Sequence, residues 1–119
     1  MRLEKAVSNG RLNWNVAFFM IKHIVMFRLK EKAEGRDREG NVMALKAMLE
    51  ALPARIEEIK FFEVGLNFSQ AAVACDLVLV SEFESKEALV SYQKHPEHLL
   101  VADFVGRACE SRFVVDYVL

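Results

Sequence analysis

Residues 21–29 read IKHIVMFRL, and this stretch decides the fold because its residue types and its spacing both predict a β-strand. Alternation along a strand places His23, Val25, Phe27 and Leu29 on one face and Ile24 and Met26 on the other. The middle of the strand is therefore apolar on both faces. A sheet built around this strand needs cover on both sides.

The next elements follow from spacing. After the charged loop 31–40, the apolar residues form a helical stripe that Pro53 ends: Val42, Leu45, Leu49 and Leu52. Segments 59–68 (IKFFEVGLNF) and 75–83 (CDLVLVSEF) are rich in β-branched and aromatic residues. They predict two strands that pair as a hairpin.

The last third of the chain predicts a broken helix and a final strand. Ser85 is the expected N-cap of a helix that continues through Tyr92. A second helical stretch opens at Pro96, because proline is well tolerated as the first residue of a helix. Residues 112–119 (RFVVDYVL) alternate as a strand.

The order β-α-β-β-α-β predicts an α+β domain of ferredoxin-like topology, with a four-stranded antiparallel sheet and the helices on one face. The chain has helix enough for one face only. A second copy of the sheet is the economical cover for the other face, so we expect a homodimer that forms one dimeric α/β barrel. We assign Val25 to the centre of this interface.

The composition limits the partners and the cellular location that we expect for this chain. Hydrophobic residues make up 53% of the 119 residues, which suits one domain that buries apolar surface against a partner. The 16 Lys+Arg and 17 Asp+Glu are evenly spread, so nucleic acid is not an expected partner. Charges interrupt the longest apolar run, so no membrane span is expected. Cys75 and Cys109 form no CxxC pair, and we expect reduced, buried thiols and a cytoplasmic protein.

Residues 1–20 show neither a helical nor a strand period, and Met20 stands immediately before the first clear strand. We therefore expect the domain to span residues 20–119 and residues 1–19 to be an extension of uncertain structure. This extension is either a start assigned too early, a non-native remnant or a real arm. Trp14, Phe18 and Phe19 favour an arm that docks. No secretion signal is expected, since the segment is polar and mixed.

Three segments carry a resemblance to a known family: IKHIVMFRLK, SEFESKEALVSYQKHPEHLLVADF and FVVDYVL. The most specific element is Tyr92-x-x-His95-Pro96-x-His98. Together they resemble the Dabb family, the stress-responsive dimeric α/β-barrel domain, over residues 20–119. The resemblance implies a dimer of two face-to-face sheets with an apolar cavity in each subunit. His23 matches a histidine near that cavity in a relative.

The resemblance also implies an acid–base pair. A plant polyketide cyclase of this family uses the residues that correspond to Tyr92 and His98. The residue types suit that chemistry, because a tyrosine hydroxyl polarises a carbonyl while a neutral imidazole removes an adjacent proton. We take Tyr92 and His98 as candidate catalytic residues, and His23, Val25, Phe27 and His95 as candidate cavity residues.

Each candidate also has a purely structural interpretation. His95 precedes a proline and can act at a helix start. Tyr92 can be a core residue with its hydroxyl at the rim, His98 can bond a backbone carbonyl, and His23 can be a satisfied core or interface histidine. No further Cys or His cluster supports a metal site at His95 and His98, so neither a metal nor a cofactor is expected.

Three classes of function stay open. The first is a stress-related barrel that binds a small apolar or aromatic molecule. The second is a cofactor-free enzyme on a carbonyl or polyketide-like substrate, such as a cyclase, isomerase or monooxygenase. The third is a structural protein in which barrel dimers associate further.

Overall fold

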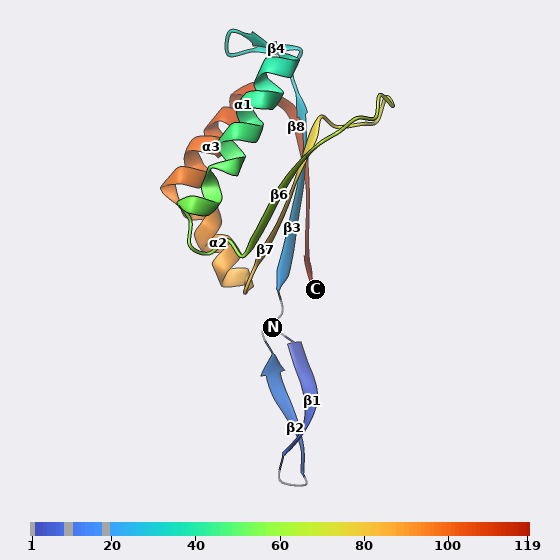
Figure 1. Ribbon diagram of the computed structural model, residues 1–119, viewed down its shortest axis with the longest axis vertical. Helices are drawn as coiled ribbons and strands as arrows, with labels where there is room; N and C mark the ends of the chain where they lie inside the picture. Colours follow the sequence, from blue (N-terminus) through green and yellow to red (C-terminus); the bar gives the residue numbers. More distant parts are fainter. Residues whose placement is uncertain (1, 9–10, 18–19) are drawn as a thin grey trace.

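The computed structural model describes residues 2–8, 11–17 and 20–119, and side chains from residue 20 onward. Its main body is a four-stranded sheet with helices packed on one face (Figure 1). The strands are β3 (Ile21–Leu29), β6 (Phe61–Leu66), β7 (Leu77–Phe83) and β8 (Cys109–Val118). They lie in the order β6-β7-β3-β8, and every neighbouring pair is antiparallel. The predicted ferredoxin-like topology is confirmed.

Three helices cover one face of this sheet: α1 (Arg38–Glu50), α2 (Lys86–Lys94) and α3 (Pro96–Ala108) (Figure 1). A short 3₁₀ turn, η1 (Leu52–Ala54), follows α1. The Ser85 side chain caps α2 by accepting a hydrogen bond from the Ala88 N–H at 3.0 Å, as predicted. The predicted break also occurs, because α2 ends before His95 and α3 begins at Pro96.

The charged loop is more ordered than the sequence suggests. Two short strands, β4 (Lys32–Ala33) and β5 (Arg36–Asp37), pair as a small hairpin within it. Helix α1 then starts at Arg38, four residues before the predicted stripe, because the Asp37 side chain accepts from the Gly40 N–H at 2.8 Å and caps the helix. The other strands differ from the predicted bounds by a few residues at their ends.

The core lies between the sheet and the helices. Alternate residues of β3 face it, including Val25, which is 4% exposed. Our assignment of Val25 to the dimer interface is therefore wrong: its parity places it under the helices. The opposite face has no helix over it and carries large apolar side chains with 40–56% exposure, namely Met26, Phe61, Phe113, Val115 and Tyr117.

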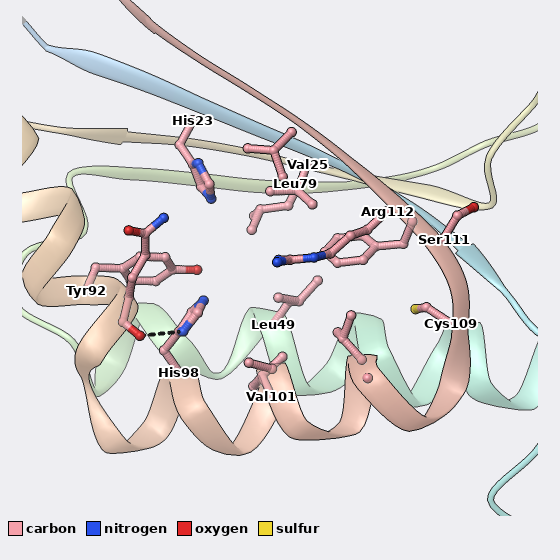
Figure 2. Close-up of a pocket in the computed structure, with 16 residues that line it drawn as sticks. His23, Val25, Leu49, Leu79, Tyr92, His98, Val101, Cys109, Ser111 and Arg112 are labelled. Atoms are coloured by element: carbon pink, nitrogen blue, oxygen red, sulfur yellow. Dashed lines mark hydrogen bonds between the residues drawn. The ribbon is translucent and has the colours of Figure 1, made fainter.

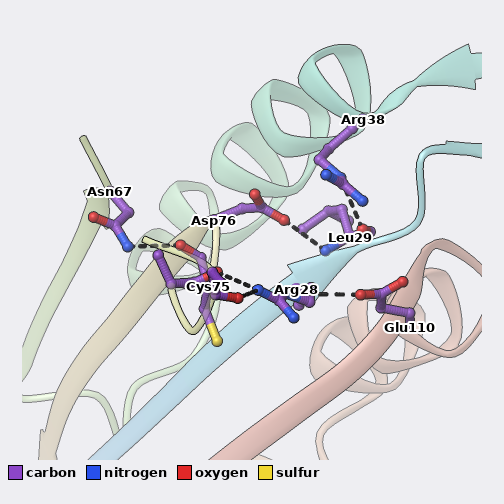
Figure 3. A network of polar contacts seen from close by, with 9 residues as sticks. Arg28, Leu29, Arg38, Asn67, Cys75, Asp76 and Glu110 are labelled. Atoms are coloured by element: carbon purple, nitrogen blue, oxygen red, sulfur yellow. Dashed lines mark hydrogen bonds and ion pairs between the residues drawn. The ribbon is translucent and has the colours of Figure 1, made fainter. Parts of the chain in front are cut away.

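A polar network holds the long connection between β6 and β7 against the end of β3 (Figure 3). The Arg28 guanidinium donates to the carbonyl oxygens of Ala72 at 2.6 Å and Ala74 at 2.9 Å. Its Nε atom also lies 3.7 Å from the Glu110 carboxylate. Asp76 accepts from the Leu29 N–H at 2.7 Å. One arginine thus links this loop to both β3 and β8.

The N-terminal segment has a backbone arrangement that the sequence did not predict. Strands β1 (Arg2–Ser8) and β2 (Arg11–Ala17) pair antiparallel as a separate two-stranded sheet, with Trp14 opposite Lys5. In Figure 1 this hairpin lies beyond the end of the main sheet. Phe18 and Phe19, which we expected to dock, lie outside the described residues. No helix in the described part of the chain is long and apolar enough to cross a membrane.

Candidate functional site

A cavity of about 500 Å³ lies between the helix-facing side of the sheet and helix α3 (Figure 2). Its wall is mostly apolar, and its polar groups are two histidines, one tyrosine, one glutamine, one serine and one arginine. The predicted residues that line it are Tyr92, His98, His23, Val25 and Phe27. Five of the six candidates are thus brought to one site from α2, α3 and β3.

Tyr92 forms the inner end of the cavity. The residue is 1% exposed, and its ring packs against Phe83 with centroids 4.8 Å apart. Burial raises the pKa of the Tyr92 hydroxyl far above its ordinary value, so the group stays protonated at physiological pH. Within the described residues the hydroxyl has no hydrogen-bond partner, and Figure 2 shows it projecting into the cavity. It is a donor available to a ligand.

His98 lies beside Tyr92, with the two ring centroids 4.6 Å apart. Its Nδ1 atom lies 3.0 Å from the Gln93 carbonyl oxygen, which can only accept, so Nδ1 carries the proton. Burial is the main cause that lowers the pKa of His98, so the ring is neutral at physiological pH. Nε2 is then an unprotonated base.

The Asp116 side chain orients the imidazole ring of His23. Its Nδ1 atom forms a short contact with the Asp116 carboxylate, which is on β8 directly opposite His23 in the sheet register. Since a carboxylate accepts, Nδ1 of His23 is the donor, and the residue also lines the cavity. This His23–Asp116 pair fixes the orientation of a ring that is 4% exposed.

His95 is the exception among the candidates. It is not among the residues that line the cavity, so the structure does not support a cavity role for it. Its Nδ1 atom accepts a hydrogen bond from the Glu97 N–H at 3.1 Å and caps α3. The structural interpretation of His95, a helix start before proline, accounts for its place.

Sequence reasoning missed Cys109, Ser111 and Arg112 at the other end of the cavity. The predicted strand begins at residue 112, whereas β8 begins at Cys109, so Cys109 and Ser111 precede the predicted strand and Arg112 is its first residue. The available signal was the alternation itself, which puts Arg112 on the same face as Val114 and Asp116. Burial raises the pKa of the Cys109 thiol to about 11, so it is protonated and is not a ready nucleophile. Both cysteines are free and half-buried, rather than buried as expected.

The described side chains do not form a metal-binding cluster. Within the described part of the chain, no three His, Cys, Asp or Glu side chains gather closely enough to hold an ion. The cavity instead contains the neutral base His98, the protonated hydroxyl of Tyr92 and the imidazole of His23, which Asp116 orients. Such a set can bind an oxygen-bearing apolar molecule and can move a proton on it.

The sheet order, the helices on one face and the cavity between them define a ferredoxin-like α+β domain. A dimeric ferredoxin-like protein of unknown function from Bacteroides fragilis superposes with a TM-score of 0.70 at 34% identity, covering 84% of this chain and 96% of that one. The hydroxynitrile lyase of Passiflora edulis shares the fold, with a TM-score of 0.74 at 20% identity over 87% of this chain and 95% of its own.

The family is equally clear. Residues 21–119 match the stress responsive A/B barrel domain, Dabb, and the chain belongs to that family. An uncharacterized protein of Streptomyces coelicolor is 37% identical over 79 residues, which is 66% of this chain and 79% of that protein. The resemblance that the sequence suggested is confirmed.

Proposed function

We propose that the chain forms a homodimeric barrel through the uncovered sheet face and binds a small apolar or aromatic carbonyl compound in the cavity of each subunit. The observation that carries the binding proposal is the free Tyr92 hydroxyl aimed into a mostly apolar cavity of about 500 Å³. A volume of this order accommodates a small ligand, and a few placed polar groups are what orient one.

Binding is tested with benzylacetone, an aromatic ketone, by calorimetry. Filling the cavity with Ala102→Phe should abolish binding, because Ala102 lines it on α3. The control is Leu99→Phe on the same helix, where the side chain is 53% exposed and is not part of the lining. Equal binding by both variants would place the ligand elsewhere and contradict the proposal.

A second candidate function is a cofactor-free enzyme, and the state of His98 favours it. Nε2 of His98 would take a proton from the carbon next to the ligand's carbonyl, while the Tyr92 hydroxyl donates a hydrogen bond to the carbonyl oxygen. The product of this step is an enolate whose oxygen accepts the Tyr92 hydrogen bond, with the transferred proton on His98, and returning that proton reverses the step. The Passiflora protein is a hydroxynitrile lyase, so the fold is compatible with an enzyme.

Proton transfer is measured as exchange of the α-hydrogens of benzylacetone for deuterium in D₂O, followed by NMR. General acid–base catalysis contributes about 10²–10⁴-fold, so His98→Asn should remove most of the protein-dependent exchange. Tyr92→Phe should slow exchange while preserving stability. Because the pKa of His98 is lowered from 6.5, the exchange rate should fall with acid only below that pH. Exchange that persists in His98→Asn would exclude His98 as the base.

A further inference from the structure

The charge of Arg112 has no role in the function proposed so far. Arg112 lies on β8 opposite Phe27 and on the helix-facing side of the sheet. Its side chain lines the cavity, and Figure 2 shows the guanidinium and the Tyr92 hydroxyl pointing toward one another across it. The residue is exposed, so its position at the end of the cavity is open to solvent and to an incoming ligand.

Arg112 differs from the other arginines of residues 20–119 in having no polar partner. Each of the others bonds or pairs with a protein group: Arg28, Arg36, Arg38, Arg55 and Arg107. No acid or carbonyl in this part of the chain lies within bonding distance of the Arg112 guanidinium. A guanidinium is charged at every physiological pH and presents donors in a fork that matches a carboxylate.

The rest of the lining carries no opposing charge. None of the sixteen residues that line the cavity is acidic. The Asp116 carboxylate, on the same face of β8, is already paired with His23. The field of Arg112 also reaches into the cavity: after burial, which is the larger cause, it contributes to the lowered pKa of His98. The cavity is thus an apolar space with an unneutralised positive charge at one end.

We propose that this cavity selects small carboxylic acids with an apolar or aromatic body, and that Arg112 binds their carboxylate. The inference rests on the proposed function, since it names the class of ligand that the same cavity takes. The apolar wall, including Leu49, Leu79 and Val101, contacts the body of the acid. The carboxylate lies on the guanidinium, which leaves Tyr92 and His98 for another oxygen or an acidic C–H of the ligand.

The test uses two probes of nearly equal shape, hydrocinnamate and its neutral amide, hydrocinnamamide, with calorimetry on the full chain. A hydrogen bond to a charged group contributes about 1.5–3 kcal/mol, so the wild type should bind the acid roughly tenfold or more tightly than the amide. Arg112→Met should remove this preference and leave the affinity for the amide unchanged. Arg112→Lys should retain part of it, because the charge remains without the fork.

The control is Arg55→Met, which removes one positive charge at an exposed residue outside the cavity lining. It should keep the preference for the acid. Equal affinities of the wild type for acid and amide would overturn the role of Arg112 while leaving the binding cavity intact. An equal loss of preference in Arg55→Met would also overturn it, by showing a general charge effect. Failure of both probes to bind would overturn this inference and the proposed binding of aromatic molecules together.

Discussion

The three histidines have different roles because their partners differ. His98 and His23 each place Nδ1 against an oxygen that can only accept, the Gln93 carbonyl in one case and the Asp116 carboxylate in the other. Their Nδ1 atoms are therefore donors. His95 instead accepts a backbone N–H with Nδ1. The types of these residues were readable from the sequence, but their proton positions depend on neighbours that only the fold supplies.

At the residue scale, Asp116→Ala should destabilise the fold. The change leaves the Nδ1–H group of a ring that is 4% exposed without its acceptor. An unsatisfied buried donor costs about 1–3 kcal/mol, and urea denaturation should show a loss of that size. Asp116→Asn should lose less, because the amide oxygen still accepts. If both variants match the wild type, the His23–Asp116 pair contributes nothing to stability.

At the element scale, the break between α2 and α3 brings the site together. Proline has no backbone N–H and cannot sit inside a helix, so Pro96 starts a new one and His95 adopts an extended backbone. Tyr92 and His98 are six residues apart, yet their rings come within 4.6 Å between centroids. Both residues and the proline between them are readable in the sequence, so this part of the site could be predicted from it.

Other elements were not predictable from local pattern. The β4–β5 hairpin turns at Glu34 and Gly35, which have φ values of 52° and 73°. A two-residue turn with both φ values positive matches the type I′ geometry, for which Asn-Gly and Asp-Gly are the strong signals. Glu-Gly is not among them, so the loop looked unstructured. Arg112 was missed for a different reason, since its role depends on which face of β8 meets the helices.

The loop between β6 and β7 should become more dynamic in Arg28→Met. This arginine donates to two loop carbonyls, at 2.6 and 2.9 Å, and the methionine cannot. Hydrogen–deuterium exchange should rise in residues 70–76 and stay unchanged in β7. The control is Arg38→Met, which removes a bond to the Leu29 carbonyl and leaves the Arg28 bonds in place. Unchanged loop exchange in Arg28→Met would show that the network does not order the loop.

At the scale of the whole molecule, the N-terminal hairpin lies outside the region that matches the family. The match to the family begins at residue 21, and β1 has β2 as its sheet partner. Deleting residues 1–19 should therefore leave the melting temperature and the dimer mass close to those of the full chain. Calorimetry and light scattering measure these two properties. Loss of a cooperative melt would show that the segment is integral to the domain.

The uncovered sheet face is where the dimer should form, since it carries Met26, Phe113 and Val115 with 40%, 53% and 56% exposure. Met26 lies opposite both Val78 and Phe113, which puts it within the sheet rather than at an edge. An uncompensated buried charge costs about 3–5 kcal/mol, so Met26→Asp should raise the dimer dissociation constant on the order of 100-fold or more.

Light scattering at micromolar concentration should show a dimer for the wild type and a monomer for Met26→Asp, with far-UV circular dichroism unchanged. Val90→Asp is the control, because Val90 is 44% exposed on α2 and lies away from this face. It should stay dimeric. Val25→Asp should instead unfold the subunit, because Val25 is buried beneath the helices and the charge would have no partner. A monomeric wild type would remove the argument that a second sheet covers this face.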